Sequence, residues 1–178
     1  MNDKLPIIYL ARHGETAWSL SGQHTGRTDL PLTECGERNA RRLGERLHGL
    51  TFAGVLVSPL KRAVRTCELA GFGGVSITDP DLLEWNYGQY EGCLTTDIHK
   101  ERPGWQLFRD GCPGGESPEQ VAARADHVGA RVRAIPGGCF DLFERPLSAD
   151  VGGPLAGARS VSRQILHAQH RELECGQL

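Results

Sequence analysis

Short apolar runs alternate with longer amphipathic segments along the first 137 residues of the chain. The short runs are rich in Ile, Leu and Val and are bounded by glycine, proline or charged residues, which predicts strands. They lie at 6–11, 54–58 and 75–78. The first run is apolar throughout, so we expect that strand to be buried on both faces. The amphipathic segments repeat apolar residues every three or four positions, which predicts helices. These lie at 33–50, 59–70 and 117–135.

Two of the predicted helices carry clear start signals. Thr33 stands directly before the first amphipathic segment, where a hydroxyl can accept a hydrogen bond from the first turn. Ser117 and Gln120 form a capping-box pattern, and Pro118 occupies the first helical position between them. Both segments are therefore expected to be helical from these residues onward.

The expected element order is strand, helix, strand, helix, strand, which indicates an α/β fold. Such an order is typical of a mostly parallel sheet covered by helices on both faces, a three-layer α/β/α domain. In this class ligands bind beyond the carboxyl ends of the strands. Three places meet that condition, at 12–13, 58–62 and 83–92.

Composition and charge exclude several classes of binding partner but say less about the reaction that the protein performs. The 178 residues suffice for one domain with a core, and the net charge of −2 offers no basic field for nucleic acid or anionic lipid. No apolar run reaches the roughly 20 residues of a membrane span, and no signal peptide is visible. The six cysteines are scattered without a CxxC pair, which favours reduced thiols and a cytoplasmic location and does not favour a zinc site.

Four chemically versatile residues fall at the predicted strand ends, namely Arg12, His13, Arg62 and Glu84. Two guanidinium groups near one imidazole suit a phosphate dianion, since arginine binds phosphate oxygens bidentately. The neighbouring positive charges favour a neutral, nucleophilic His13. A protonated Glu84 would then be able to donate a proton to a leaving alkoxide. Taken singly, each residue is as well explained by a structural or solvated role, so the residues alone indicate an anion-binding α/β enzyme.

Five segments resemble the signature motifs of the histidine phosphatase superfamily, which includes phosphoglycerate mutases and fructose-2,6-bisphosphatases. They read LARHGETAW, HTGRTDLPLTECG, VLVSPLKRAVRT, LLEWNYGQYEG and DGCPGGES. They occur in the family's order and cover residues 5 to about 137. The resemblance implies a phosphoglycerate mutase-like fold for this part of the chain.

The resemblance also implies roles for individual residues. His13 would be the nucleophile, Arg12 and Arg62 would bind the phosphoryl group, and Glu84 would be the general acid and base. Four further residues would line the substrate pocket, namely Ser19, Thr25, Gly26 and Tyr87. No metal ion or other cofactor is implied.

Other aromatic residues lie close to these motifs. Trp18 and Trp85 flank them and are expected to wall the pocket, whereas Trp105 is expected to serve packing. His24 lies in the loop after the first motif, where it could edge the pocket or be a surface residue.

The last forty residues depart from the family pattern. The family uses a second histidine in an S-G-H or S-H-G segment that ends another strand, with a helix after it. The chain from Gly138 to Leu178 contains no such segment and no β-branched strand. We therefore expect residues beyond about 138 to be irregular and the corresponding strand position of the sheet to be empty or badly filled.

A shift of reading frame accounts for this departure. Codons for Gly138–Arg159 can be chosen so that the neighbouring frame reads a strand, an S-G-H and an apolar helix, as the family requires. One extra guanine in the codons for Pro136 and Gly137 would produce the observed residues. The chain is thus expected to consist of an incomplete histidine phosphatase domain, 1–137, and an aberrant tail, 138–178.

These observations predict a phosphomonoesterase that acts on a small phosphorylated metabolite through a phosphohistidine on His13. The motif at 82–92 and the turn before the last helix look most like the sugar-phosphate phosphatase branch. A phosphoglycerate mutase is one alternative, although mutases generally carry extra length after the Glu84 motif. A non-catalytic phosphate-binding remnant is the other.

Overall fold

The computed structural model describes residues 7–135 and 140–143. Four strands are described: β1 (Ile8–Ala11), β2 (Gly54–Val57), β3 (Ser76–Thr78) and β4 (Phe140–Phe143). The α-helices are α1 (Ala17–Ser21), α2 (Glu34–Leu47), α3 (Lys61–Leu69), α4 (Thr95–Glu101), α5 (Leu107–Asp110) and α6 (Pro118–Ala134). Two short 3₁₀ helices, η1 (Pro80–Leu82) and η2 (Gly88–Tyr90), lie between β3 and α4.

The four strands form one parallel sheet in the order β1-β4-β2-β3. The register aligns Ala11 of β1 with Phe143 of β4, and Phe143 with Val57 of β2. The carboxyl ends of these three strands therefore lie level, so that the chain segments after β1 and β2 begin at the same edge of the sheet. The parallel α/β sheet predicted from the element order is confirmed.

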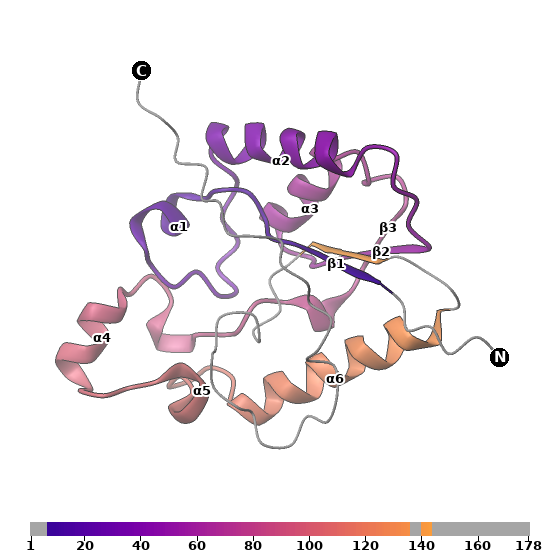
Figure 1. Cartoon of the computed structure of the whole chain (residues 1–178). Helices are drawn as coiled ribbons and strands as arrows, with labels where there is room; N and C mark the ends of the chain where they lie inside the picture. The colour runs from indigo at the N-terminus through magenta and orange to yellow at the C-terminus, as the bar shows by residue number, and fades with distance from the viewer. Residues whose placement is uncertain (1–6, 136–139, 144–178) are drawn as a thin grey trace.

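Helices cover both faces of the sheet, as Figure 1 shows, with α2 and α3 on one side and α6 on the other. The side chains of β2 alternate between these layers. Val55 and Val57 pack with α3 residues such as Ala63, whereas Leu56 packs with Val128 and Val132 of α6. This alternation follows from the two-residue period of a strand and makes β2 the centre of the core.

The expectation that the first strand is buried on both faces is wrong. Ile8 and Leu10 are 38% and 39% exposed, although Ala11 is buried. The reason is that β1 is an edge strand of the described sheet, and the residues of α6 that pack on the sheet contact Leu56 of β2.

The strand position that was expected to be empty or badly filled is not empty. β4 lies between β1 and β2 and pairs with both along its four residues. Backbone hydrogen bonding does not require β-branched side chains, because strand preference depends more on the neighbouring strands than on intrinsic propensity. The predicted irregularity of the rest of the tail concerns residues 144–178, which lie outside the described residues.

Helix boundaries follow the local signals closely. Thr33 accepts a hydrogen bond from Gly36 N–H, and Ser117 and Gln120 form the predicted capping box. Helix α2 ends at Leu47, whereas the sequence predicted an end at residue 50. The reason is that Gly49 adopts a φ of 83°, which an α-helix cannot contain. α1, α4 and α5 lie in segments for which no helix was predicted.

The loop after β1 and the start of α2 approach each other backbone to backbone. A Cβ on Gly14 would lie 2.4 Å from the carbonyl oxygen of Gly36, and a Cβ on Gly36 would lie 2.3 Å from the carbonyl oxygen of Glu15. The hydroxyl and N–H of Thr33 reinforce this contact by binding the side chain and the carbonyl of Glu15. Glycine is therefore required at both positions by space.

Gly14→Ala should lower the free energy of unfolding by about 1–3 kcal/mol, the usual cost of adding a methyl group to a filled site. Equilibrium denaturation measures this loss. Gly74→Ala is the matched control, because a Cβ there meets nothing within 4 Å. Equal stability of the two variants would contradict the close approach described above.

Candidate active site

His13 is the second residue after β1, and one of its ring nitrogens is hydrogen-bonded to the next residue in the chain. Nδ1 lies 2.7 Å from the carbonyl oxygen of Gly14. Since a carbonyl oxygen can only accept, Nδ1 carries the hydrogen, and Nε2 is the nitrogen that holds the lone pair in the neutral ring. The Gly14 N–H, which belongs to the preceding peptide group, donates to Thr66 Oγ1 of α3 at 3.0 Å and so holds the backbone between His13 and Gly14.

The surroundings of His13 keep the ring neutral. Burial lowers the pKa of His13 to about 4; the Gly14 carbonyl acts against this, and the charges of Arg62 and Arg12 add to it. The predicted direction is confirmed, but burial is the larger cause and the arginine charges are secondary. In the unfolded chain a histidine titrates near 6.5, so the fall of pH from about 6.5 to 4 favours unfolding.

Arg62 is fully buried in the first turns of α3. Its two terminal nitrogens donate to backbone carbonyls of the loop after α1, to Thr28 O at 3.1 Å and to Gly26 O at 2.9 Å. Arg62 thus holds this loop while its charge acts on His13. Arg12, by contrast, is exposed at the end of β1.

Gly26 lies in the loop after α1, close to the segment that follows Glu84. Its φ is 54°, and a Cβ there would lie 2.4 Å from the Glu91 carboxylate and 2.9 Å from the Trp85 carbonyl. Glu91 binds the backbone N–H groups of Arg27 and Thr28. The loop is therefore bound through Glu91 to the part of the chain that follows Glu84, and through the carbonyls of Gly26 and Thr28 to Arg62.

Glu84 lies in the irregular segment between η1 and η2, and its Oε1 accepts a hydrogen bond from Trp85 N–H at 3.0 Å. The same segment contains Tyr87, which stacks on His24 at a ring-centroid distance of 4.6 Å. His24 Nε2 also lies 3.1 Å from Thr95 Oγ1, and burial lowers the pKa of His24. His24 therefore belongs to an aromatic cluster beside Tyr87 and is not a solvated surface residue.

Two of the predicted pocket residues have structural partners. The Ser19 hydroxyl accepts from Thr16 N–H at 2.8 Å, which closes the capping box of α1, and the Thr25 carbonyl accepts from Thr28 N–H at 3.2 Å. The expectation that Trp85 walls an open pocket is wrong, because this side chain is fully buried and its indole N–H donates to Glu116 O at 3.0 Å.

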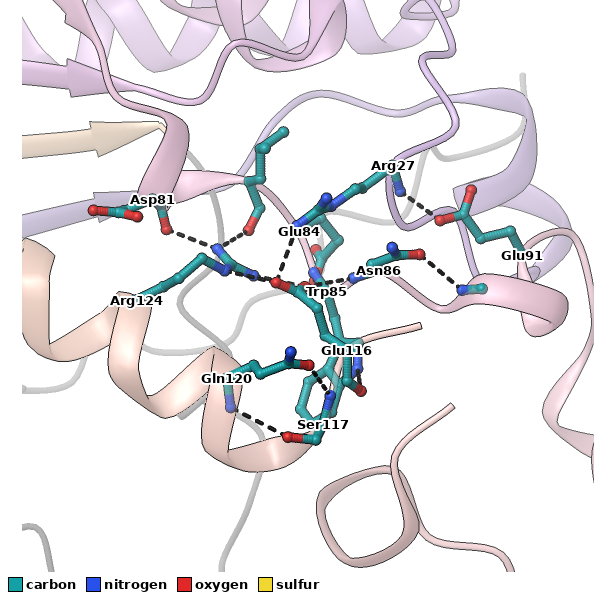
Figure 2. A network of polar contacts seen from close by, with 12 residues as sticks. Arg27, Asp81, Glu84, Trp85, Asn86, Glu91, Glu116, Ser117, Gln120 and Arg124 are labelled. Carbon is teal, nitrogen blue, oxygen red and sulfur yellow. Dashed lines mark hydrogen bonds and ion pairs between the residues drawn. The ribbon is translucent and has the colours of Figure 1, made fainter. Parts of the chain in front are cut away.

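A polar network around Glu116 was not predicted. The Glu116 carboxylate binds Arg27, Arg124 and the N–H of Asn86, all at 2.9–3.0 Å, as drawn in Figure 2. The sequence feature that could have indicated this network is the acidic residue directly before the Ser117 cap, in the GGES turn. Helix capping accounts for Ser117, whereas no local hydrogen-bonding pattern accounts for a buried glutamate at position 116.

Within residues 7–135 and 140–143, no group of three or more His, Cys, Asp or Glu side chains is placed to hold a metal ion. In the same part of the chain, no helix is long and apolar enough to cross a membrane.

Comparison with known proteins relates this geometry to a family. Residues 8–138 match the profile of the histidine phosphatase superfamily, branch 1. The chain is 44% identical over 121 residues to an acid phosphatase of Mycobacterium tuberculosis, with 67% of this chain and 59% of the relative covered. It is 39% identical over 157 residues to the sedoheptulose 1,7-bisphosphatase of Saccharomyces cerevisiae, with 73% and 56% covered.

A second kind of relative carries a mutase name. The chain is 34% identical over 150 residues to a protein of Cronobacter sakazakii named "Probable phosphoglycerate mutase GpmB", with 82% of this chain and 69% of that protein covered. Among solved structures, an open reading frame product of Mycobacterium tuberculosis superposes with a TM-score of 0.74 at 36% identity, covering 80% of this chain and 75% of that one. The chain spans less than two thirds of the length of the acid phosphatase and of the bisphosphatase.

His13 should remain a neutral Nδ1–H tautomer well below the usual pH range of histidine titration. In nitrogen-labelled protein, the ring resonances of His13 should keep their neutral pattern down to about pH 5 and change with a midpoint near 4. Exposed His48 provides the control in the same spectra. A His13 midpoint near 6.5 would show that burial does not control this residue.

Proposed function

Because the chain belongs to the histidine phosphatase superfamily, we propose that it is a phosphomonoesterase that acts through a phosphohistidine on His13. The observation that carries the proposal is the state of the His13 ring. A neutral imidazole with its hydrogen on Nδ1 presents a lone pair on Nε2, and two arginines supply positive charge beside it. This combination suits attack on a phosphate monoester.

In the first step His13 Nε2 attacks phosphorus and the bond from phosphorus to the ester oxygen breaks. Glu84, in its protonated form, gives its proton to that oxygen, which leaves as an alcohol. Arg62 and Arg12 stabilise the negative charge on the non-bridging oxygens. The products of this step are phosphohistidine, a Glu84 carboxylate and the free alcohol.

In the second step water attacks the phosphoryl group and the bond from phosphorus to Nε2 breaks. The Glu84 carboxylate takes a proton from the attacking water, which restores both catalytic groups and releases inorganic phosphate. His13 is the nucleophile in this scheme and Glu84 is the proton carrier in both directions.

The substrate proposed is a small phosphorylated metabolite of the sugar-phosphate class. Support comes from the name of the yeast relative, a sedoheptulose 1,7-bisphosphatase. Ser19, Thr25, Gly26 and Tyr87 are proposed to line the pocket around it.

A mutase is the second candidate, since one relative is named as such. Both reactions involve a phosphohistidine and differ in the group that accepts its phosphoryl group, which is water for a phosphatase and a hydroxyl of a phosphoglycerate molecule for a mutase. Phosphate release from a sugar phosphate, without interconversion of phosphoglycerates, supports the phosphatase.

His13→Ala should abolish turnover of sugar phosphates and 4-nitrophenyl phosphate, because the variant has no group at this position to accept the phosphoryl group. Acid-labile, base-stable phosphate should also disappear from the protein. His48→Ala, which changes an exposed histidine at the end of α2, should retain parent activity. Retention of a tenth of the parent activity in His13→Ala would show that another residue is the nucleophile.

We further propose that the tail impairs the activity of this chain. The family's second histidine would donate to the transferring oxygens, and loss of one such donor costs on the order of 10²–10³ in kcat. A chain restored to the alternative frame after Ile135 should gain activity by about that factor in assays of phosphate release. Equal activity of the two chains would refute the frameshift account and leave the role of His13 unaffected.

A further inference from the structure

Glu84 lies in a segment that has no regular structure of its own, and yet proton transfer requires its carboxyl group to be placed closely. What holds this segment is a set of bonds to its backbone and to its neighbouring side chains. Several of these bonds come from the turn before α6 and from α6 itself.

Glu116 binds the segment on the side that follows Glu84. Its carboxylate accepts from Asn86 N–H at 2.9 Å, its own N–H donates to Asn86 O at 2.9 Å, and its carbonyl accepts from the Trp85 indole at 3.0 Å. The two residues after the proposed acid are therefore bound to one residue, as Figure 2 shows.

Arg124 binds the segment on the side that precedes Glu84. Its Nη1 donates to Leu83 O and to Asp81 O, both at 2.8 Å. Its other two nitrogens bind the two oxygens of Glu116, each at 2.9 Å. Glu84 thus lies between two anchored stretches of backbone, and the anchors are bound to each other.

The pair is buried, so its geometry is strict. The side chains of Arg124 and Glu116 are 16% and 11% exposed. Burial alone would raise the pKa of Glu116, but the bonds from Arg124 and Asn86 and the charges of Arg124 and Arg27 outweigh it, so the pKa lies below its ordinary value. A carboxylate held in this way cannot move without leaving buried charge unpaired.

Glu116 also reaches the loop that Arg62 holds. Arg27 Nη2 lies 3.0 Å from Glu116 Oε1, and Arg27 directly follows Gly26, whose carbonyl Arg62 binds. One carboxylate therefore connects the backbone around the proposed acid with the loop beside the proposed phosphate-binding arginine.

We propose that Glu116, together with Arg124, is a positioning residue that places Glu84 for proton transfer to the leaving alcohol. This inference rests on the proposed function. It predicts a particular defect, because a displaced acid slows the expulsion of a poor leaving group far more than that of a good one. An alkoxide needs the proton, whereas 4-nitrophenolate leaves nearly as well without it.

The test compares kcat/KM for glycerol 2-phosphate with kcat/KM for 4-nitrophenyl phosphate in each variant. This constant reports the steps up to phosphorylation of His13, and the ratio of the two values cancels any difference in the folded fraction. Glu116 Oε2 accepts from both Asn86 and Arg124 Nη2, and Oε1 accepts from Arg27 and Arg124 Nε. Glu116→Gln replaces one of these oxygens by an NH₂ group, which cannot accept, so two of the four bonds are lost and a donor faces donors. It should lose about 10–100-fold on glycerol 2-phosphate and less than about threefold on 4-nitrophenyl phosphate.

The matched control is Asp79→Asn, which also converts a buried carboxylate paired with an α6 arginine into an amide. Asp79 binds Arg131 at 2.7 Å and the N–H of Asp81, but within the described residues it makes no hydrogen bond to Leu83, Trp85 or Asn86. Its ratio should stay at the parent value. Arg124→Lys, which keeps the charge and loses the paired contacts, should shift the ratio as Glu116→Gln does and serves if that variant does not fold.

Glu84→Gln distinguishes a failure of the positioning role from a failure of the proposed function. If it shows the leaving-group-dependent loss and Glu116→Gln and Arg124→Lys do not, the positioning role is refuted and the proposed function stands. If Glu84→Gln shows no such dependence, or the parent cleaves neither ester, the proposed function itself is refuted and the inference with it.

Discussion

The hydrogen bond from the His13 ring to the carbonyl of Gly14 is the constraint around which the rest of the site is arranged. It assigns the hydrogen to Nδ1 and leaves the lone pair on Nε2. This bond requires the backbone on both sides of Gly14 to be fixed. Thr66 of α3 binds the Gly14 N–H on one side, and the close approach of Gly36 in α2 confines the Gly14–Glu15 peptide on the other. The packing of α2 and α3 against the sheet thus helps to determine which nitrogen of the His13 ring carries the lone pair.

The proposed nucleophile and the proposed acid are held by different layers of the fold. The nucleophile depends on β1, α2 and α3, whereas the segment of the proposed acid depends on α6 through Glu116 and Arg124. Arg27 joins the two halves, since it lies in the loop held by Arg62 and binds Glu116. The proposed mechanism requires a rigid link of this kind, because in it the nucleophile and the acid act on the same phosphorus–oxygen bond in one step.

Local signals in the sequence predict the elements whose causes are local. The capping residues of α2 and α6 and the apolar runs of β2 and β3 were identified in this way. β4 was missed because Phe140–Phe143 is a strand through pairing with β1 and β2, which are distant in sequence. Glu116 was missed for the same reason, since its partners Arg27 and Asn86 are 89 and 30 residues away. The neutral state of His13 was expected from charge, but burial, its main cause, depends on tertiary structure.

The central claim is that the phosphoryl group passes through His13 before it reaches water. The most direct test is the stereochemistry at phosphorus, for which a thiophosphate monoester made chiral with two oxygen isotopes is hydrolysed in water that carries the third. Two successive in-line displacements, on His13 and then on water, predict net retention of configuration. Inversion would mean that water attacks the ester directly, and it would contradict the account.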